Sequence, residues 1–309
     1  MNAKLAKIIS VTVAVVLAVT AGSAPAQQTS ASTSTGSHSS TDKSIEYHGG
    51  KVLRFQPDVY VIWYGCWGTS GCGAPAATQY NDAGTMEILT DFLSTLGSTS
   101  YFAINQLYPD ANGNAPSGSL IYGGDAFDAY SHGSALTEAD IAAVITDQFA
   151  TGALPVDPNG IFIVVTSSDV SVEDAATKFC LTCCNLHGYF SYEGGNFPYI
   201  FVGNPARCPT GCGAWHDSPN ANFAADSMAS WLAHALNAAV TDPFYTAWYD
   251  RNGLENSEKC EGTYGTTYTV TNADGQSAFA NIQLGRRHFL LQQNWVNGKK
   301  GHCAINWVQ

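Results

Sequence analysis

The stretch Gly160–Thr166 has the sequence GIFIVVT, and Asp58–Tyr64 has the sequence DVYVIWY. Both stretches are short, rich in β-branched residues and bounded by turn signals. Their apolar character is almost continuous, which is typical of strands that are buried on both faces in the middle of a sheet. A similar run, PYIFV, occupies residues 198–202. These three runs predict the central strands of one sheet.

Three helices are predicted from apolar side chains that recur at helical spacing. Residues 87–96 and 226–240 each place such side chains on one face. Residues 136–149 do the same, and they include Thr137-x-x-Asp140, the form of a capping box. Because the predicted strands are separated by helices, we expect an α/β fold in which a layered central sheet is flanked by helices.

The pattern changes after Cys260, where the chain becomes rich in Gly and Asn. Residues 266–270 and 287–292 predict short strands, so we expect a partly β C-terminal tail. The sequence contains no internal repeat and no second linker. We therefore expect one domain over residues 44–309.

The first 43 residues predict secretion. Residues 1–26 combine Lys4 and Lys7 with an apolar run and end in Ala24-Pro25-Ala26, the small-x-small form of a cleavage site. Residues 27–43 are nearly all Ser, Thr, Gln and Gly, which is the composition of a disordered linker. We expect an extracellular protein whose mature chain has no membrane span.

Composition excludes several classes of function. The formal net charge is −12 and no basic block occurs, so we expect no nucleic-acid partner. No Gly-x-Ser-x-Gly motif is present, so an α/β-hydrolase site is not supported. Aromatic side chains are abundant and could line a carbohydrate platform, although core packing explains most such residues. The tryptophans are Trp63, Trp67, Trp215, Trp231, Trp248, Trp295 and Trp307.

Several motifs occur together in a specific order and spacing. They include Tyr47-His-Gly-Gly, Phe179-Cys-x-x-x-Cys-x-x-His187-Gly, Cys208-x-x-x-Cys212 and Gly285-Arg-Arg. Over about residues 45–309 the chain resembles the EXORDIUM or phosphate-induced protein family. The resemblance implies secretion to the cell wall or apoplast and a role in growth or nutrient responses. It implies no established biochemical activity.

Residues 228–260 resemble microbial relatives of that family, which carry His-Glu-x-x-Glu and look like zincin metallopeptidases. Positions i and i+4 of a helix share a face and can hold one metal, and the Glu after the His acts as general base. Here the motif is His234-Ala-Leu-Asn-Ala238. Neither Ala235 nor Ala238 can bind a metal or move a proton. We therefore expect a zincin-like helix in a non-catalytic pseudoenzyme that has no cofactor.

Two metal-binding alternatives remain open. In a metallopeptidase with displaced ligands, His234 would be joined by acidic residues downstream, because a catalytic zinc needs three protein ligands. The acidic candidates are Asp242, Asp250 and Glu255. A calcium site would instead use the side-chain oxygens of Asp250, Asn252, Glu255 and Glu258. We favour a protein that binds a cell-wall or cell-surface component, with carbohydrate as one candidate.

The chain has nine cysteines, and secretion makes disulfides the default. Cys66 and Cys72 could close a small local loop. Cys260 and Cys303 stand alone on either side of the tail, so they are the natural pair. A bridge between them would hold the C-terminal tail to the rest of the domain.

The other cysteines lie in two Cys-x-x-x-Cys clusters, Cys180 with Cys184 and Cys208 with Cys212. We expect the clusters to pair within or between themselves, and a zinc knuckle that includes His187 is the alternative. The family pattern uses Cys180 and Cys184, so the resemblance implies that Cys183 is unpaired. A reactive Cys183 thiol beside His187 is the second alternative.

Overall fold

The computed structural model describes residues 44–68, 80–175, 177–213, 218–298 and 300–307. The predicted signal peptide, residues 1–26, and the predicted linker, residues 27–43, lie outside these ranges and stay predictions. Within the described ranges, no helix has both the length and the apolar character that a membrane span needs.

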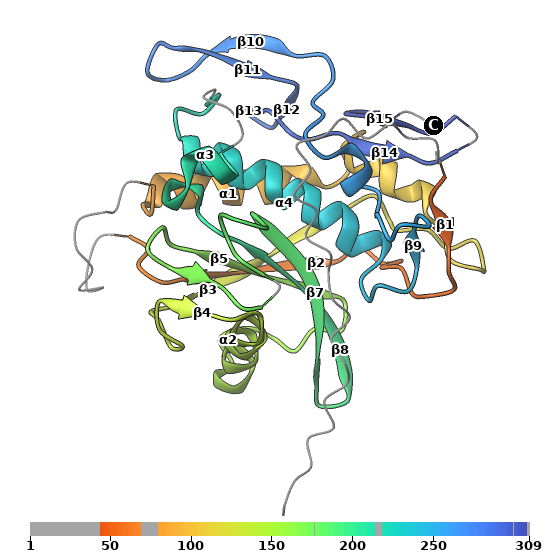
Figure 1. Ribbon diagram of the computed structural model, residues 1–309, viewed down its shortest axis with the longest axis horizontal. Helices are drawn as coiled ribbons and strands as arrows, with labels where there is room; N and C mark the ends of the chain where they lie inside the picture. Colours follow the sequence, from red (N-terminus) through yellow and green to blue (C-terminus); the bar gives the residue numbers. More distant parts are fainter. Residues whose placement is uncertain (1–43, 69–79, 176, 214–217, 299, 308–309) are drawn as a thin grey trace, which may run out of the picture. The chain divides into compact units, whose positions relative to one another are not determined.

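A five-stranded mixed sheet forms the centre of the fold (Figure 1). Its strand order is β3-β2-β5-β8-β7. The strands are β2 (Asp58–Tyr64), β3 (Ile121–Asp128), β5 (Gly160–Thr166), β7 (Asn185–Tyr192) and β8 (Gly195–Val202). Only β7 runs antiparallel to its neighbour. The three strands predicted from sequence are the three central ones, and the structure confirms the α/β class with a sheet packed against helices.

Helices cover both faces of the sheet. The helices α1 (Ala83–Leu96) and α4 (Phe223–Thr241) pack on one face, and α2 (Glu138–Thr151) packs on the other. The predicted capping box is present in α2, where Thr137 and Asp140 exchange side-chain to backbone hydrogen bonds. The helices α1 and α4 begin before the predicted patterns, which start at 87 and 226, whereas α2 begins two residues after its pattern, which starts at 136. In each helix a capping side chain, that of Asp82, Thr137 or Asn222, fixes the start.

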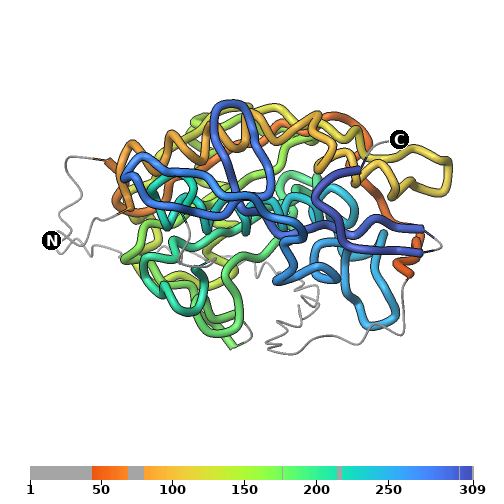
Figure 2. Tube along the Cα trace, turned by 90° about the horizontal axis from the view of Figure 1, so that it is seen from above, coloured from red at the N-terminus to blue at the C-terminus, as the bar shows by residue number. Residues whose placement is uncertain are grey.

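Helix α4 is buried on nearly all sides. Every residue of it except Phe223 and Trp231 is buried, so the single apolar stripe expected from the sequence is only part of what is covered. Figures 1 and 2 show the reason: the blue C-terminal segments run across the helical layer on the side away from the sheet. A helix that is covered all round belongs to the core rather than to the surface.

The remaining elements are short. Two strand pairs lie outside the main sheet and the C-terminal tail: β1 (Glu46–Tyr47) with β9 (Trp248–Tyr249), and β4 (Ala135–Leu136) with β6 (Ser171–Val172). The short helices are η1 (Phe102–Leu107), η2 (Pro205–Arg207), α3 (Pro209–Cys212) and η3 (Glu258–Cys260).

The C-terminal tail forms three antiparallel strand pairs. They are β10 (Tyr268–Thr271) with β11 (Ser277–Ala280), β12 (Ile282–Leu284) with β13 (Arg287–Phe289), and β14 (Asn294–Val296) with β15 (His302–Ala304). The two strands predicted here correspond to β10 and β13. The other four were not predicted; all six strands have only three or four residues, which is too short for a reliable period in the sequence.

Three disulfides lie in the C-terminal half of the chain. They join Cys180 to Cys208, Cys184 to Cys212, and Cys260 to Cys303. The two Cys-x-x-x-Cys clusters therefore bridge to each other, and the zinc-knuckle alternative is wrong because its four sulfur ligands are oxidised. Cys66 is also disulfide-bonded, whereas Cys72, its predicted partner, lies outside the described residues.

Cys183 is a free, half-buried cysteine. Burial raises the pKa of its thiol to about 11, and the nearby Glu138 carboxylate acts in the same direction. The nucleophilic form of a cysteine is the thiolate, so a raised pKa speaks against the reactive-thiol alternative.

The described tryptophans belong to the core. Trp63, Trp67 and Trp295 are buried, and the other three pack against the same core from partly exposed positions. These three are Trp231, Trp248 and Trp307. Trp215 lies outside the described residues. The six described side chains therefore contribute to packing rather than to an exposed platform.

Candidate functional site

His234 and the two alanines that follow it lie in the interior. His234 is 9% exposed, while Ala235 and Ala238 are 0% and 1% exposed. Burial and the nearby His187 lower the pKa of His234 to about 4, and Gln292 hydrogen-bonds to the ring. Near neutral pH the imidazole is therefore uncharged.

The structure surrounds this part of α4 with further ionisable side chains. We call the group His187, His234, Asp242, Glu255 and Glu258 the buried cluster. Its members come from β7, from α4 and the residue that ends it, and from η3 and the segment that leads into it. The helix thus brings together side chains from parts of the chain that are far apart in sequence.

A close ion pair forms the centre of the buried cluster. His187 Nε2 lies 2.7 Å from Glu255 Oε2, and both side chains are more than nine-tenths buried. Tyr245 donates a hydrogen bond to the backbone carbonyl of His187. Asp242 is fixed through Oδ1, which accepts hydrogen bonds from the backbone N–H groups of Thr246 and Ala247.

Burial sets the protonation of the cluster. It acts to lower the pKa of His187, but the Glu255 carboxylate and its hydrogen bond outweigh this effect and raise it. Burial raises the pKa of Asp242 to about 6 and that of Glu258 to about 7, and the charge on Glu255 adds to both shifts. The cluster therefore favours the protonated form of the His187 imidazole, and Asp242 and Glu258 take up protons more easily than free carboxyl groups do.

Several buried polar atoms of the cluster have no hydrogen-bond partner among the described residues. They are Nδ1 of His187, Nδ1 of His234, Oδ2 of Asp242 and Oε1 of Glu255. Such atoms are rare in native proteins. Their concentration in one place makes the buried cluster the main polar centre of the interior.

The geometry does not assemble the metal ligands considered from the sequence. Among the described residues, no three His, Cys, Asp or Glu side chains are arranged so that they could hold a metal ion. Asp250 is used elsewhere, because its Oδ2 lies 2.9 Å from Nζ of Lys259 in a buried ion pair. Asn252 is exposed to solvent. Of the displaced-ligand set, only Asp242 and Glu255 lie with His234 in the cluster.

Sequence reasoning missed two members of the buried cluster in their actual role. His187 was considered only as a zinc-knuckle ligand or beside Cys183, and Glu258 only as a calcium ligand. No local pattern links His187 to Glu255, because 68 positions separate them. The place of His187 in the Cys-x-x-His motif was the one signal in the sequence that this residue matters.

These features define an α/β protein with a disulfide-linked tail and a buried histidine–carboxylate cluster. The chain matches the model of the phosphate-induced protein 1 conserved region over residues 45–305. It is 31% identical to Protein EXORDIUM-like 3 of Arabidopsis thaliana, with 81% of this chain and 80% of the relative covered. It therefore belongs to the phosphate-induced, or EXORDIUM-like, protein family, as the sequence motifs indicated.

Two further members of the family are similar to the chain over most of its length. Protein EXORDIUM-like 5 of Arabidopsis thaliana is 30% identical, with 85% of this chain and 78% of the relative covered. Protein PHOSPHATE-INDUCED 1 of Nicotiana tabacum is 28% identical, with 71% and 72% covered. No solved structure matches the chain.

The buried cluster predicts that stability falls as pH rises. Folding raises the pKa of Glu258 from 4.5 to about 7 and that of Asp242 from 3.8 to about 6. The folded state therefore keeps protons that the unfolded chain has released, and the stabilisation is lost as pH rises through the folded-state values. Folding also raises the pKa of His187 above its ordinary value of 6.5. Above that pH, this group too makes the free energy of unfolding fall as pH rises. Folding lowers the pKa of His234 from 6.5 to about 4, so between these values this group makes the free energy of unfolding rise with pH.

Urea unfolding of wild type and Glu258→Gln checks this expectation. The free energy of unfolding of the wild type should be lower at about pH 8 than at about pH 5, and Glu258→Gln should remove about 2 kcal/mol of that fall. The matched control is Glu46→Gln, because Glu46 is exposed on β1. Equal pH profiles for wild type and Glu258→Gln would contradict the assignment.

Proposed function

We propose that this protein is secreted and acts without catalysis, by binding a component of the cell wall or cell surface. In this proposal α4 is a zincin-like helix that has lost its metal chemistry. The observation that carries the proposal is the burial of Ala235 and Ala238 at the two positions where the microbial pattern has glutamate. The helix is kept, and the two chemical groups that the motif needs are replaced by methyl groups.

The packing around Ala235 has also changed from the environment that a general base needs. Ala235 belongs to the apolar core that α4 shares with α1 and the sheet. A glutamate there would place a carboxylate among apolar side chains, which is costly unless the charge is paired. The helix surface beside His234 is therefore built as core, and a general base has no polar environment at that position.

Secretion is supported by independent features. Residues 1–26 have the form of a signal peptide. Three disulfides in the C-terminal half suit an oxidising compartment, since disulfides seldom persist in the cytosol. The family membership is consistent with a role in growth or nutrient response, which we include in the proposal.

A metallopeptidase with displaced ligands is the second candidate function. The unpartnered Nδ1 atom of His234 favours it, because this imidazole is neutral and a neutral imidazole nitrogen is a common metal ligand. The unpartnered Nδ1 atom of His187 would have to lose its proton first. His187 also has its other nitrogen on a carboxylate, as metal-bound histidines usually do. The lack of a converging third ligand among the described residues weighs against it.

Analysis of the protein purified from culture medium tests the proposal. Full-length chain is expressed in a secreting host and purified without chelators. We expect the mature chain to begin at Gln27, to carry no stoichiometric zinc and to cleave none of a broad set of peptide substrates. One equivalent of zinc together with peptidase activity, both lost in His234→Ala, would move the metallopeptidase to first place. A chain retained inside the host cell would contradict secretion.

A further inference from the structure

A polar groove shares no residue with the buried cluster and is not used by the proposal above. It encloses about 360 Å³, which is within the usual range for ligand sites. Its walls come from α1, the segment before α4, the turn between β10 and β11, and the turn between β12 and β13. The residues that matter most are Glu87, Asn220, Arg286, Arg287 and His288.

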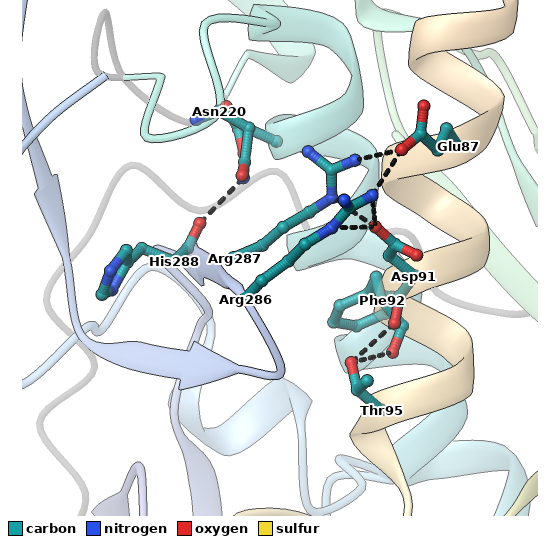
Figure 3. Close-up of polar contacts among 9 residues, drawn as sticks. Glu87, Asp91, Phe92, Thr95, Asn220, Arg286, Arg287 and His288 are labelled. Carbon is teal, nitrogen blue, oxygen red and sulfur yellow. Dashed lines mark hydrogen bonds and ion pairs between the residues drawn. The ribbon is translucent and has the colours of Figure 1, made fainter. Parts of the chain in front are cut away.

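Two arginines and two carboxylates form one wall of the groove: Arg286, Arg287 and Glu87 line it, and Asp91 contacts both arginines from outside the lining (Figure 3). Arg286 and Arg287 both contact Glu87 and Asp91, at distances from 2.5 to 3.3 Å. These contacts use Nε and Nη2 of each guanidinium, so Nη1 of each has no partner among the described residues. The four side chains carry two positive and two negative charges, and the wall is neutral overall.

The opposite side of the groove is fixed in place. Nδ2 of Asn220 donates to the carbonyl of His288 at 2.8 Å, as Figure 3 shows, and to the buried Asp226. Nδ1 of His288 lies 2.9 Å from the hydroxyl of Tyr268. Tyr268 is 40% exposed and its ring meets the His288 ring edge to face, so it holds His288 from outside the groove lining.

We infer that this groove binds a neutral oligosaccharide, an inference that rests on the proposed binding function. Sugar hydroxyls both donate and accept hydrogen bonds, and the wall offers guanidinium donors directly beside carboxylate acceptors. Arg286 is 69% exposed and therefore reachable.

The balance of charges in the wall of the groove favours a neutral ligand over an acidic one. Burial works against ionisation of Asp91, but hydrogen bonds from Arg287 and Arg286 lower the pKa of its carboxyl group, so it stays charged. A ligand carboxylate entering the groove would meet the negative charges of Asp91 and Glu87 as well as the two arginines. A neutral hydroxyl-rich ligand meets no such repulsion.

A printed array of neutral and acidic oligosaccharides, probed with the purified mature protein, tests the inference. We expect neutral oligosaccharides to be bound, and the strongest of them is then titrated by calorimetry. Arg286→Ala should weaken that binding about tenfold or more, since it removes charge-assisted hydrogen bonds. The matched control is Arg54→Ala, an exposed arginine outside the groove, which should leave the affinity within about twofold.

Three outcomes would overturn the inference: no neutral oligosaccharide bound, only acidic ones bound, or neutral binding unchanged in Arg286→Ala. The last outcome would show that the arginine–carboxylate contacts only fasten the turn between β12 and β13 to α1. Thermal unfolding of each variant shows whether lost binding reflects lost folding. Zinc content and peptidase activity are measured separately, so failure of the groove is distinguishable from failure of the proposed function.

Discussion

Replacing His187 by alanine is expected to destabilise the fold by about 3–5 kcal/mol, the usual effect of leaving a buried charge without its partner. The variant removes the cation that faces Glu255 at 2.7 Å. Asp242, Glu255 and Glu258 would then lie near one another in the interior with no histidine cation between them. Urea unfolding at neutral pH measures the change.

A comparison of variants sharpens this prediction. Glu255→Ala should cost less than His187→Ala, because it removes one carboxylate from the cluster as well as the partner of the imidazole. The cost of His187→Ala should also shrink at about pH 5, where Asp242 and Glu258 can take up protons. A larger cost for Glu255→Ala at every pH would contradict this description of the electrostatics.

An exposed histidine provides the control. His132 is 28% exposed and pairs with Asp147 at 2.9 Å, which is a contact of similar length at the surface. His132→Ala should change the free energy of unfolding by less than about 1 kcal/mol. The contrast between the two histidines measures what burial adds to the same type of ion pair.

Removing the Cys260–Cys303 disulfide is expected to destabilise the protein by about 4 kcal/mol on the chain-entropy model. The bridge closes a loop with a sequence separation of 43 and joins η3 to β15. Because η3 begins at Glu258, loosening the tail should also disturb the buried cluster. The double variant Cys260→Ser/Cys303→Ser avoids a new free thiol, and urea unfolding measures the effect.

Cys183→Ser is the matched control, because Cys183 is the free cysteine of the described chain. It should change the free energy of unfolding by less than about 1 kcal/mol. An equal loss for Cys183→Ser and for the double variant would mean that the tail is held by packing and not by the bridge.

The central strands and the helices could be predicted because each carries its own local signal. The runs at Asp58–Tyr64 and Gly160–Thr166 are continuously apolar, and each is a buried strand. The edge strand β3 was missed because its side chains alternate between exposed and half-buried, and its sequence IYGGDAFD contains two glycines. The antiparallel strand β7 was missed for a similar reason, since polar residues interrupt its apolar ones.

The buried cluster could be predicted only in part. His234, Asp242 and Glu255 stood out because they lie near a recognisable motif. The pairing of His187 with Glu255 depends on how β7 packs against α4 and the following segment, and nothing local in the sequence encodes that packing. The groove at Arg286 likewise depends on a turn of the tail meeting α1, about 200 residues earlier in the chain.

Calorimetric titration with Zn²⁺ after chelation tests most directly whether α4 has lost its metal chemistry. The experiment compares the unmodified protein with His234→Ala and with Ala235→Glu/Ala238→Glu, which restores both glutamates of the motif. We expect the unmodified protein and His234→Ala to show the same absence of tight binding, and the double variant, where it folds, to be the one that gains affinity. Tight binding of one equivalent by the unmodified protein, abolished in His234→Ala, would contradict the account.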